Sequence, residues 1–164
     1  MRGAILEKGE KGYTLLRAIF SSIKDVQRNY NWLITDCVCY PNDKSFADLL
    51  GRKYCLLSGD ELTNMVEKED FQWVWAVLSG FGKDVLLKEV LKYELPYANG
   101  YGEFWTNPVT IQHPLAEIEI VAWDSTSTLL ISKNCAIVDD FRKAFPLSED
   151  LEEYNNAPHS CAPL

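Results

Sequence analysis

Five cysteines and two histidines are the side chains best able to bind a metal ion or to act as a nucleophile. Cys37 and Cys39 are separated by one residue, so on a strand both thiols lie on one face, and Cys55 falls on a nearby predicted strand. Zinc sites usually contain a C-x-x-C pair, which this sequence lacks. His113 alone is placed to act as a base for a cysteine, since His159 lies in the C-terminal tail. We therefore predict that most cysteines are small buried hydrophobic residues and that no metal is bound.

A second possible chemistry is phosphate binding by the segment Ser79–Asp84, which carries two glycines between a predicted strand and a predicted helix. Backbone N–H groups at such a turn can point at an anion. However, the segment matches neither the G-x-x-x-x-G-K-[ST] nor the G-x-G-x-x-G pattern, and Asp84 would repel a phosphate. An ordinary strand–helix turn is the better interpretation, so we predict neither a nucleotide nor any other cofactor.

Hydrolase chemistry has equally little support. The G-x-S-x-G nucleophile motif is absent. Glu117 and Glu119 share one face of a predicted strand, which we expect to be the outer, solvated face. These patterns favour a binding protein over an enzyme.

The predicted loop 96–108 is the segment most suggestive of binding, because aromatic residues alternate there with glycines. Such side chains can stack on a ligand ring or anchor a protein interface. Alternatively they fold back as a lid over the core, since large aromatic residues are usually buried. The four aromatic residues are Tyr97, Tyr101, Phe104 and Trp105.

The chain has a net charge of −8, and most of it lies in residues 83–164. A surface of this sign repels nucleic acid and anionic membranes, so we expect neither as a partner, whereas a basic protein is compatible. The acidic segment 148–154 is the second candidate site, as a docking surface for such a protein. Its acidic residues are Glu149, Asp150, Glu152 and Glu153. The alternative is that these charges serve only solubility.

The location expected from the sequence is the cytoplasm. The first residues contain only a short apolar run before charges return, unlike a secretory signal. No window approaches the length of a membrane-spanning helix. An odd number of cysteines without a regular spacing is also poor evidence for secreted disulfides.

The elements that must position these residues alternate between helical and strand patterns. Apolar residues at helical spacing predict helices over 13–26 and 84–93. Ser58 and Glu61 form the S-x-x-E pattern of a capping box and predict a helix start. Two short strands are predicted at 32–34 and 37–40.

Further along the chain, Phe71–Ser79 is predicted to be a core strand, with Trp73 and Trp75 on one face. Segments 117–123 and 128–132 are predicted to form a hairpin. The mixed order of helices and strands predicts an α+β fold, with helices packed on a mostly antiparallel or mixed sheet. We expect one domain over residues 1–154 and a flexible C-terminal tail over residues 155–164.

Three stretches of the chain resemble a family of small uncharacterised bacterial proteins, mostly from Gram-positive species. The stretches are Asn29–Ile34, Glu117–Ser125 continuing to Leu130, and Phe141–Pro146 with Asp150–Asn155. The resemblance implies a bacterial, cytoplasmic protein. It assigns no activity, so no catalytic or binding role is transferred to any residue.

These observations lead to a main hypothesis and two alternatives. The main hypothesis is a non-enzymatic, cytoplasmic protein-binding module, similar to an immunity protein or antitoxin, that blocks a basic partner. The first alternative is a small-ligand protein or enzyme with a pocket under the Tyr97–Trp105 loop, in which His113 or Asp124 makes polar contacts. The second is a purely structural homo-oligomer.

Overall fold

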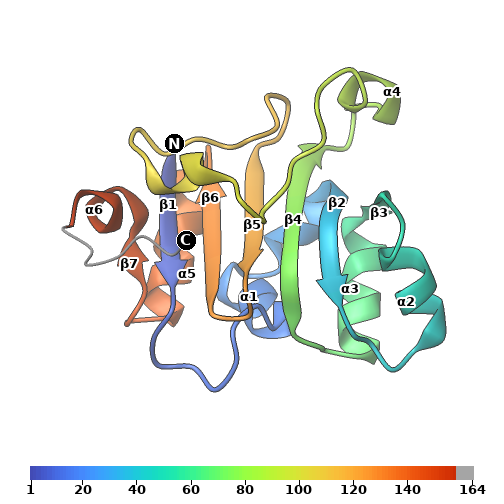
Figure 1. Ribbon diagram of the computed structural model, residues 1–164, viewed down its shortest axis with the longest axis horizontal. Helices are drawn as coiled ribbons and strands as arrows, with labels where there is room; N and C mark the ends of the chain where they lie inside the picture. Colours follow the sequence, from blue (N-terminus) through green and yellow to red (C-terminus); the bar gives the residue numbers. More distant parts are fainter. Residues whose placement is uncertain (158–164) are drawn as a thin grey trace.

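A seven-stranded antiparallel sheet forms the centre of the computed structural model, which describes residues 1–157 (Figure 1). The strand order is β3-β2-β4-β5-β6-β1-β7. The predicted α+β class, with helices packed on a mostly antiparallel sheet, is confirmed. The strands are β1 (Arg2–Leu6), β2 (Tyr30–Cys39), β3 (Tyr54–Ser58), β4 (Trp73–Gly82), β5 (Ile118–Trp123), β6 (Ser127–Ser132) and β7 (Glu149–Asp150).

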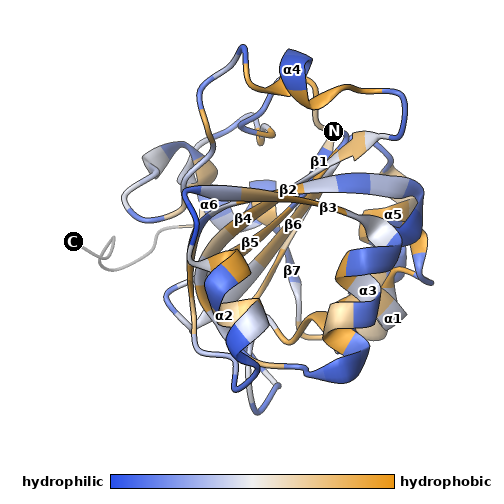
Figure 2. Ribbon diagram, turned by 90° about the vertical axis from the view of Figure 1, so that its right-hand side faces the viewer, coloured by the Kyte–Doolittle hydropathy of each residue, from blue (hydrophilic) through white to orange (hydrophobic). Residues whose placement is uncertain are grey.

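The two faces of the sheet are covered differently. Helices α1, α3 and α5 pack against one face, and Figure 2 shows α1 and α3 on the same side of the sheet. The segment 83–117 and α6 cover part of the opposite face, where a second hydrophobic core forms (Figure 1). The α-helices are α1 (Leu16–Ser22), α2 (Lys44–Leu50), α3 (Gly59–Lys68), α4 (Leu87–Val90), α5 (Cys135–Ala144) and α6 (Leu151–Asn156). The 3-10 helices are η1 (Val26–Asn29) and η2 (Gly102–Trp105).

Elements specified by short-range signals are formed as predicted. Ser58 and Glu61 make the complete capping box at the start of α3. β5 and β6 form the predicted hairpin. In the structure, the Asn134 side chain also caps a helix, α5, by accepting a hydrogen bond from the backbone N–H of Ala136.

The two short strands predicted around Asp36 are wrong, because β2 is one continuous strand. Its register with β4 shifts between Thr35 and Val38 and again between Val38 and Cys39. Asp36 has a positive φ of 49° in this irregular stretch. The shift between Thr35 and Val38 is a β-bulge, which adds a residue to one strand without ending that strand.

The second of these register shifts turns Trp73 and Trp75 to opposite faces of β4, although they were predicted to share a face. Trp73 belongs to the core under α1 and α3, whereas Trp75 packs against the core on the opposite face. The register shift between Val38 and Cys39 lies opposite Trp73 and Trp75 in the ladder, so the alternation of faces is broken between them.

The helices predicted over 13–26 and 84–93 are shorter in the structure, at Leu16–Ser22 and Leu87–Val90. Thr14 precedes α1 with a φ of 55°, and Lys24 and Asp25 follow it with φ values of 57° and 59°. Residues in the left-handed conformation cannot continue a right-handed helix. The backbone conformation of these three residues therefore limits α1 at both ends.

Helix α6 continues to Asn156, two residues past the predicted boundary at residue 154. The Asn155 side-chain amide donates hydrogen bonds to the backbone oxygens of Phe104, at 3.0 Å, and Thr106, at 3.2 Å. The rest of the predicted tail, with His159 and Cys161, lies outside the described residues. Among residues 1–157, no helix is long and apolar enough to cross a membrane.

Candidate functional site

The aromatic loop packs against tryptophans at the ends of two strands. The ring of Trp123, at the end of β5, lies 4.8 Å from the ring of Trp105 and 5.0 Å from that of Trp75, both edge to face. Phe104 lies 6.3 Å from Trp123 and is only 2% exposed. Phe104 therefore anchors the loop to the core, as the lid alternative predicted.

The other rings of the loop remain partly or largely exposed. Tyr97 is 47% exposed, and its ring contacts that of Tyr101 at 5.3 Å. Tyr101 also contacts the ring of the anchor Phe104 at 4.7 Å. We call the five rings that reach solvent here the aromatic surface. They are Trp75, Tyr97, Tyr101, Trp105 and Trp123.

Helix α6 lies directly beside this loop, so the two segments predicted separately from the sequence are neighbours (Figure 1). The Asn107 side-chain amide donates to the backbone oxygen of Glu152 at 3.0 Å. Asn155 donates to the Phe104 backbone oxygen, and the ring of Tyr154 lies 6.1 Å from that of Trp105. The end of the loop, residues 104–107, thus lies against α6.

Two of the four predicted acidic residues are used within the fold. Glu149 is bonded to Lys8, with 2.7 Å between Oε1 and Nζ. Asp150 lies within 3.3 Å of the Arg2 guanidinium and 3.4 Å of that of Arg142. Asp150 also caps α6 by accepting hydrogen bonds from two backbone N–H groups. Its role is therefore to fix the position of α6.

Glu152 and Glu153 remain exposed, as does Glu103 in η2. Within residues 1–157, none of these three carboxylates forms an ion pair with a lysine or arginine. Glu103 accepts a hydrogen bond from the Tyr101 hydroxyl at 3.1 Å. Burial, together with this carboxylate, raises the pKa of Tyr101 to about 12, so its hydroxyl stays a neutral donor. We call these three glutamates the rim carboxylates.

The start of the loop is fixed by two side chains, Asp36 and Gln112, for which no such role was predicted. The Asp36 carboxylate accepts hydrogen bonds from the backbone N–H groups of Ala98, at 2.8 Å, and Asn99, at 2.9 Å. The Gln112 side chain accepts from Tyr97 N at 3.1 Å and donates to Tyr97 O at 2.7 Å. The polar Thr35-Asp36 pair inside an apolar strand was the only signal of this role.

Glu119 is completely buried, so the prediction that it lies on a solvated outer face is wrong. Its carboxylate accepts hydrogen bonds from the Gln112 backbone at 2.9 Å, the Ser79 hydroxyl at 3.0 Å and the His113 backbone at 3.3 Å. The segment 83–117 covers this face of β5. Burial raises the pKa of Glu119 to about 7. Glu117, at the edge of the same face, is exposed as predicted.

His113 is 1% exposed and is enclosed by the rings of Phe81, at 4.8 Å, and Tyr93, at 5.3 Å. Its Nδ1 accepts from the backbone N–H of Leu115 at 3.2 Å, so Nε2 carries the proton and donates to the Val90 carbonyl at 3.1 Å. Burial lowers the pKa of His113, which favours this neutral form. Its hydrogen bonds therefore position the segment 83–117.

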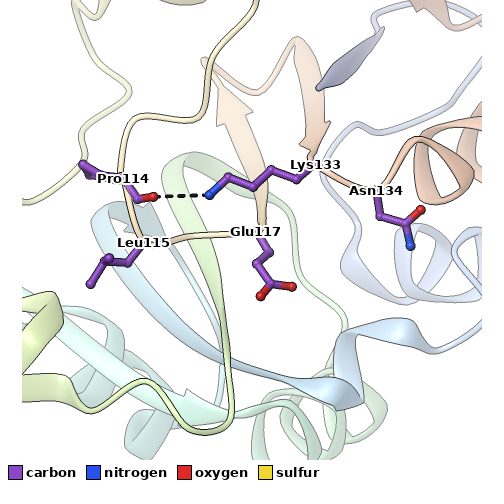
Figure 3. A pocket seen from close by; sticks show the side chains of 5 residues that line it. All are labelled: Pro114, Leu115, Glu117, Lys133 and Asn134. Atoms are coloured by element: carbon purple, nitrogen blue, oxygen red, sulfur yellow. Dashed lines mark hydrogen bonds between the residues drawn. The ribbon is translucent and has the colours of Figure 1, made fainter.

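Two open hollows lie away from the aromatic loop. Lys133 crosses one of them and donates to the Pro114 carbonyl at 3.2 Å, while Glu117 and Asn134 point elsewhere (Figure 3). The other lies between α1 and α5. Neither is lined by residues 97–105. Among residues 1–157, no group of three or more His, Cys, Asp or Glu side chains is arranged to hold a metal ion.

No family model matches the chain, and comparisons with curated proteins and with solved structures give no match. The resemblance to a bacterial family therefore stays a prediction. The geometry itself defines an α+β protein with an open antiparallel sheet. One face of that sheet carries an aromatic loop held by hydrogen bonds, with exposed Glu103 in the loop and exposed Glu152 and Glu153 on the neighbouring helix α6.

Proposed function

We propose that this protein is a protein-binding module that holds a basic segment of another protein against the aromatic surface and the rim carboxylates. The observation that carries this proposal is the docking of the aromatic loop onto α6 through Asn107 and Asn155. This docking places α6, which carries the exposed Glu152 and Glu153, next to the loop that carries Glu103 and the partly exposed rings. An immunity-like or antitoxin-like role, in which a basic partner is blocked in the cytoplasm, is the form we favour.

The aromatic surface has the properties of a binding hot spot. Tryptophan and tyrosine supply large contact areas and lose little conformational entropy on binding. Here the loop that carries them is already held by Asp36, Gln112 and Asn155. A surface that is ordered before binding avoids part of the entropic cost of association.

The charge around these rings favours a cationic partner. The segment 93–132, which supplies the loop and β5, contains no lysine or arginine. An arginine or lysine of the partner can therefore pair with a rim carboxylate and lie over a tryptophan or tyrosine ring. Nucleic acid and anionic membranes would be repelled by the same charges.

The small-ligand alternative has less support, because the described residues place Phe104, the central ring of the loop, in the core beneath it. Phe104 is buried there, and the rings of Trp75 and Trp123 pack together beside it. His113 is enclosed and Asp124 lies exposed in the β5–β6 turn, and neither lines either of the two hollows described within residues 1–157.

The proposal is tested by selecting peptides from a random displayed library on the immobilised protein at low salt. We expect the selected peptides to combine arginine or lysine with apolar residues, and one synthetic peptide is then used as the probe. Selection of acidic peptides, or no enrichment above a blank support, would contradict the proposal. Enrichment of small aromatic compounds from a metabolite panel, without peptide binding, would favour the alternative.

Trp105→Ala is expected to weaken binding of the selected peptide at least tenfold, or about 1.4 kcal/mol, because a central aromatic anchor is lost. Fluorescence anisotropy of the labelled peptide measures the effect, and the circular dichroism spectrum verifies folding. Leu86→Ala is the control, since Leu86 is 55% exposed in the segment before α4. Equal affinities of the Trp105 variant and the wild type would exclude the aromatic surface as the site.

Neutralising the two exposed glutamates of α6 in Glu152→Gln/Glu153→Gln is expected to weaken the same binding roughly threefold to tenfold at low salt. The difference should shrink at about 0.5 M salt, because screening shortens the range of the charges. The control Glu10→Gln/Asp48→Asn changes the net charge equally, and both of its residues are exposed and lie outside the loop, β5 and α6. An equal loss in the control would show that net charge alone drives binding.

A further inference from the structure

Cys37 and Cys39 form a close pair of thiols for which the proposed binding function has no use. Their Sγ atoms are 3.6 Å apart, and both side chains are partly exposed. Both lie on the face of β2 that packs towards α1, α2 and α3. Two sulfurs in contact and within reach of solvent can be joined, whereas isolated cysteines cannot.

The backbone at this pair allows the approach that a disulfide needs. Residues two apart in a strand have Cα atoms separated by about 6.5 Å, within the upper part of the range found for disulfides. The β2–β4 register shifts on both sides of Val38, so the strand is irregular between the two cysteines. Fewer ladder hydrogen bonds must therefore be distorted when the sulfurs move together.

We propose that Cys37 and Cys39 form a reversible dithiol–disulfide pair that exchanges with a small-molecule disulfide such as glutathione disulfide. The Cys39 thiolate attacks one sulfur of the small disulfide, forms a mixed disulfide and releases one small thiolate. Cys37 then loses its proton and attacks Cys39 Sγ, which releases the second small thiol. Both cysteines are oxidised together by two electrons, and one small disulfide is reduced to two thiols.

The order of attack follows from the hydrogen bond between the sulfurs. The hydrogen bond between the two sulfurs raises the pKa of Cys37 and lowers that of Cys39, so Cys39 is the better nucleophile. A disulfide between residues two apart on a strand is strained, and strained disulfides are reduced easily. The bond is therefore suited to reversible regulation and unsuited to permanent cross-linking.

The other described cysteines provide internal comparisons. Cys55 is buried, and burial raises the pKa of its thiol to about 11. Cys135 is exposed at the start of α5. If exposure alone decided reactivity, Cys135 would be modified first and the pair would show no preference for an internal bond.

The test is to equilibrate the full-length folded protein in glutathione buffers of increasing oxidation, quench it with an alkylating agent and digest it with trypsin. The peptide 29–44 contains Cys37 and Cys39 and no other cysteine. We expect this peptide to lose two hydrogen atoms and to escape alkylation as the buffer becomes oxidising. The change should reverse in reducing buffer and should persist in Cys135→Ser.

Three outcomes in the folded protein would overturn the proposal. They are full alkylation of both cysteines at every buffer ratio, accumulation of a glutathione adduct without the internal bond, and a cross-link of either residue to Cys55. Cys39→Ser should leave Cys37 unable to form the internal bond while the protein stays folded. Formation of the bond equally well in denatured protein would show that the fold does not bring the pair together, and would also count against it.

Discussion

Replacing Glu119 with leucine is expected to lower the free energy of unfolding by about 3 kcal/mol. The carboxylate is the hydrogen-bond acceptor for the backbone N–H groups of Gln112 and His113 and for the Ser79 hydroxyl. Leucine fills similar space but accepts nothing. Each buried donor left without an acceptor costs about 1–3 kcal/mol, and the relief from burying a carboxyl offsets only part of this cost.

Urea denaturation followed by tryptophan fluorescence measures the effect on stability. Glu117→Leu is the matched control, because Glu117 lies two residues earlier, on the same strand face, and is exposed. We expect the control to change stability by less than about 0.5 kcal/mol. If the two variants are equally stable, Glu119 has no special structural role.

Loss of the Glu119 carboxylate is also expected to disturb the aromatic surface. Glu119 holds the backbone of Gln112, and the Gln112 side chain holds Tyr97 at the start of the loop. Asp36 fixes the next two residues, and Asn155 fixes the end of the loop near Phe104 and Thr106. The proposed binding surface is therefore supported from the second core as well as from α6.

The parts of this structure that could be predicted from the sequence depend on local signals. The capping box at Ser58 and Glu61 and the β5–β6 hairpin need only residues close together in the chain. The opposite facing of Trp73 and Trp75 could not be predicted, because it results from a bulge in the β2–β4 pairing.

The two segments of the candidate site could be predicted from the sequence, but their proximity could not, because it depends on tertiary contacts. The aromatic and acidic segments stand out by composition, but their proximity depends on bonds between Asn107, Asn155 and residues more than 40 positions away. Whether Glu119 is solvated or buried depends on whether another segment covers its strand. Alternation along a strand identifies faces, and only tertiary packing decides which face is buried.

Glu119 is also expected to make stability fall as pH rises between about pH 4.5 and about pH 7. Burial raises its pKa to about 7 in the folded protein, above the value of about 4.3 in an unfolded chain. The folded state therefore binds the proton more tightly, and its advantage is complete below the unfolded pKa. The advantage is lost as pH rises through the folded pKa, by up to about 4 kcal/mol in total.

Other groups act in the opposite direction, so the effect must be measured as a difference between variants. Burial lowers the pKa of His113, and hydrogen bonds lower the pKa values of Glu61 and Glu69; each of these groups favours the folded state at higher pH. Glu119→Gln removes one titratable group, the Glu119 carboxyl, and leaves His113, Glu61 and Glu69 in place. Glutamine also keeps one acceptor oxygen for the N–H of Gln112 or of His113.

The stability of Glu119→Gln relative to the wild type is therefore expected to rise with pH, by about 3 kcal/mol between about pH 4.5 and about pH 8. Urea denaturation at several pH values measures this difference, with Glu117→Gln as a control whose difference should not change with pH. A constant difference for Glu119→Gln would mean that Glu119 titrates alike in the folded and unfolded chains. In that case its buried hydrogen bonds would stabilise the charged form enough to cancel the cost of burial.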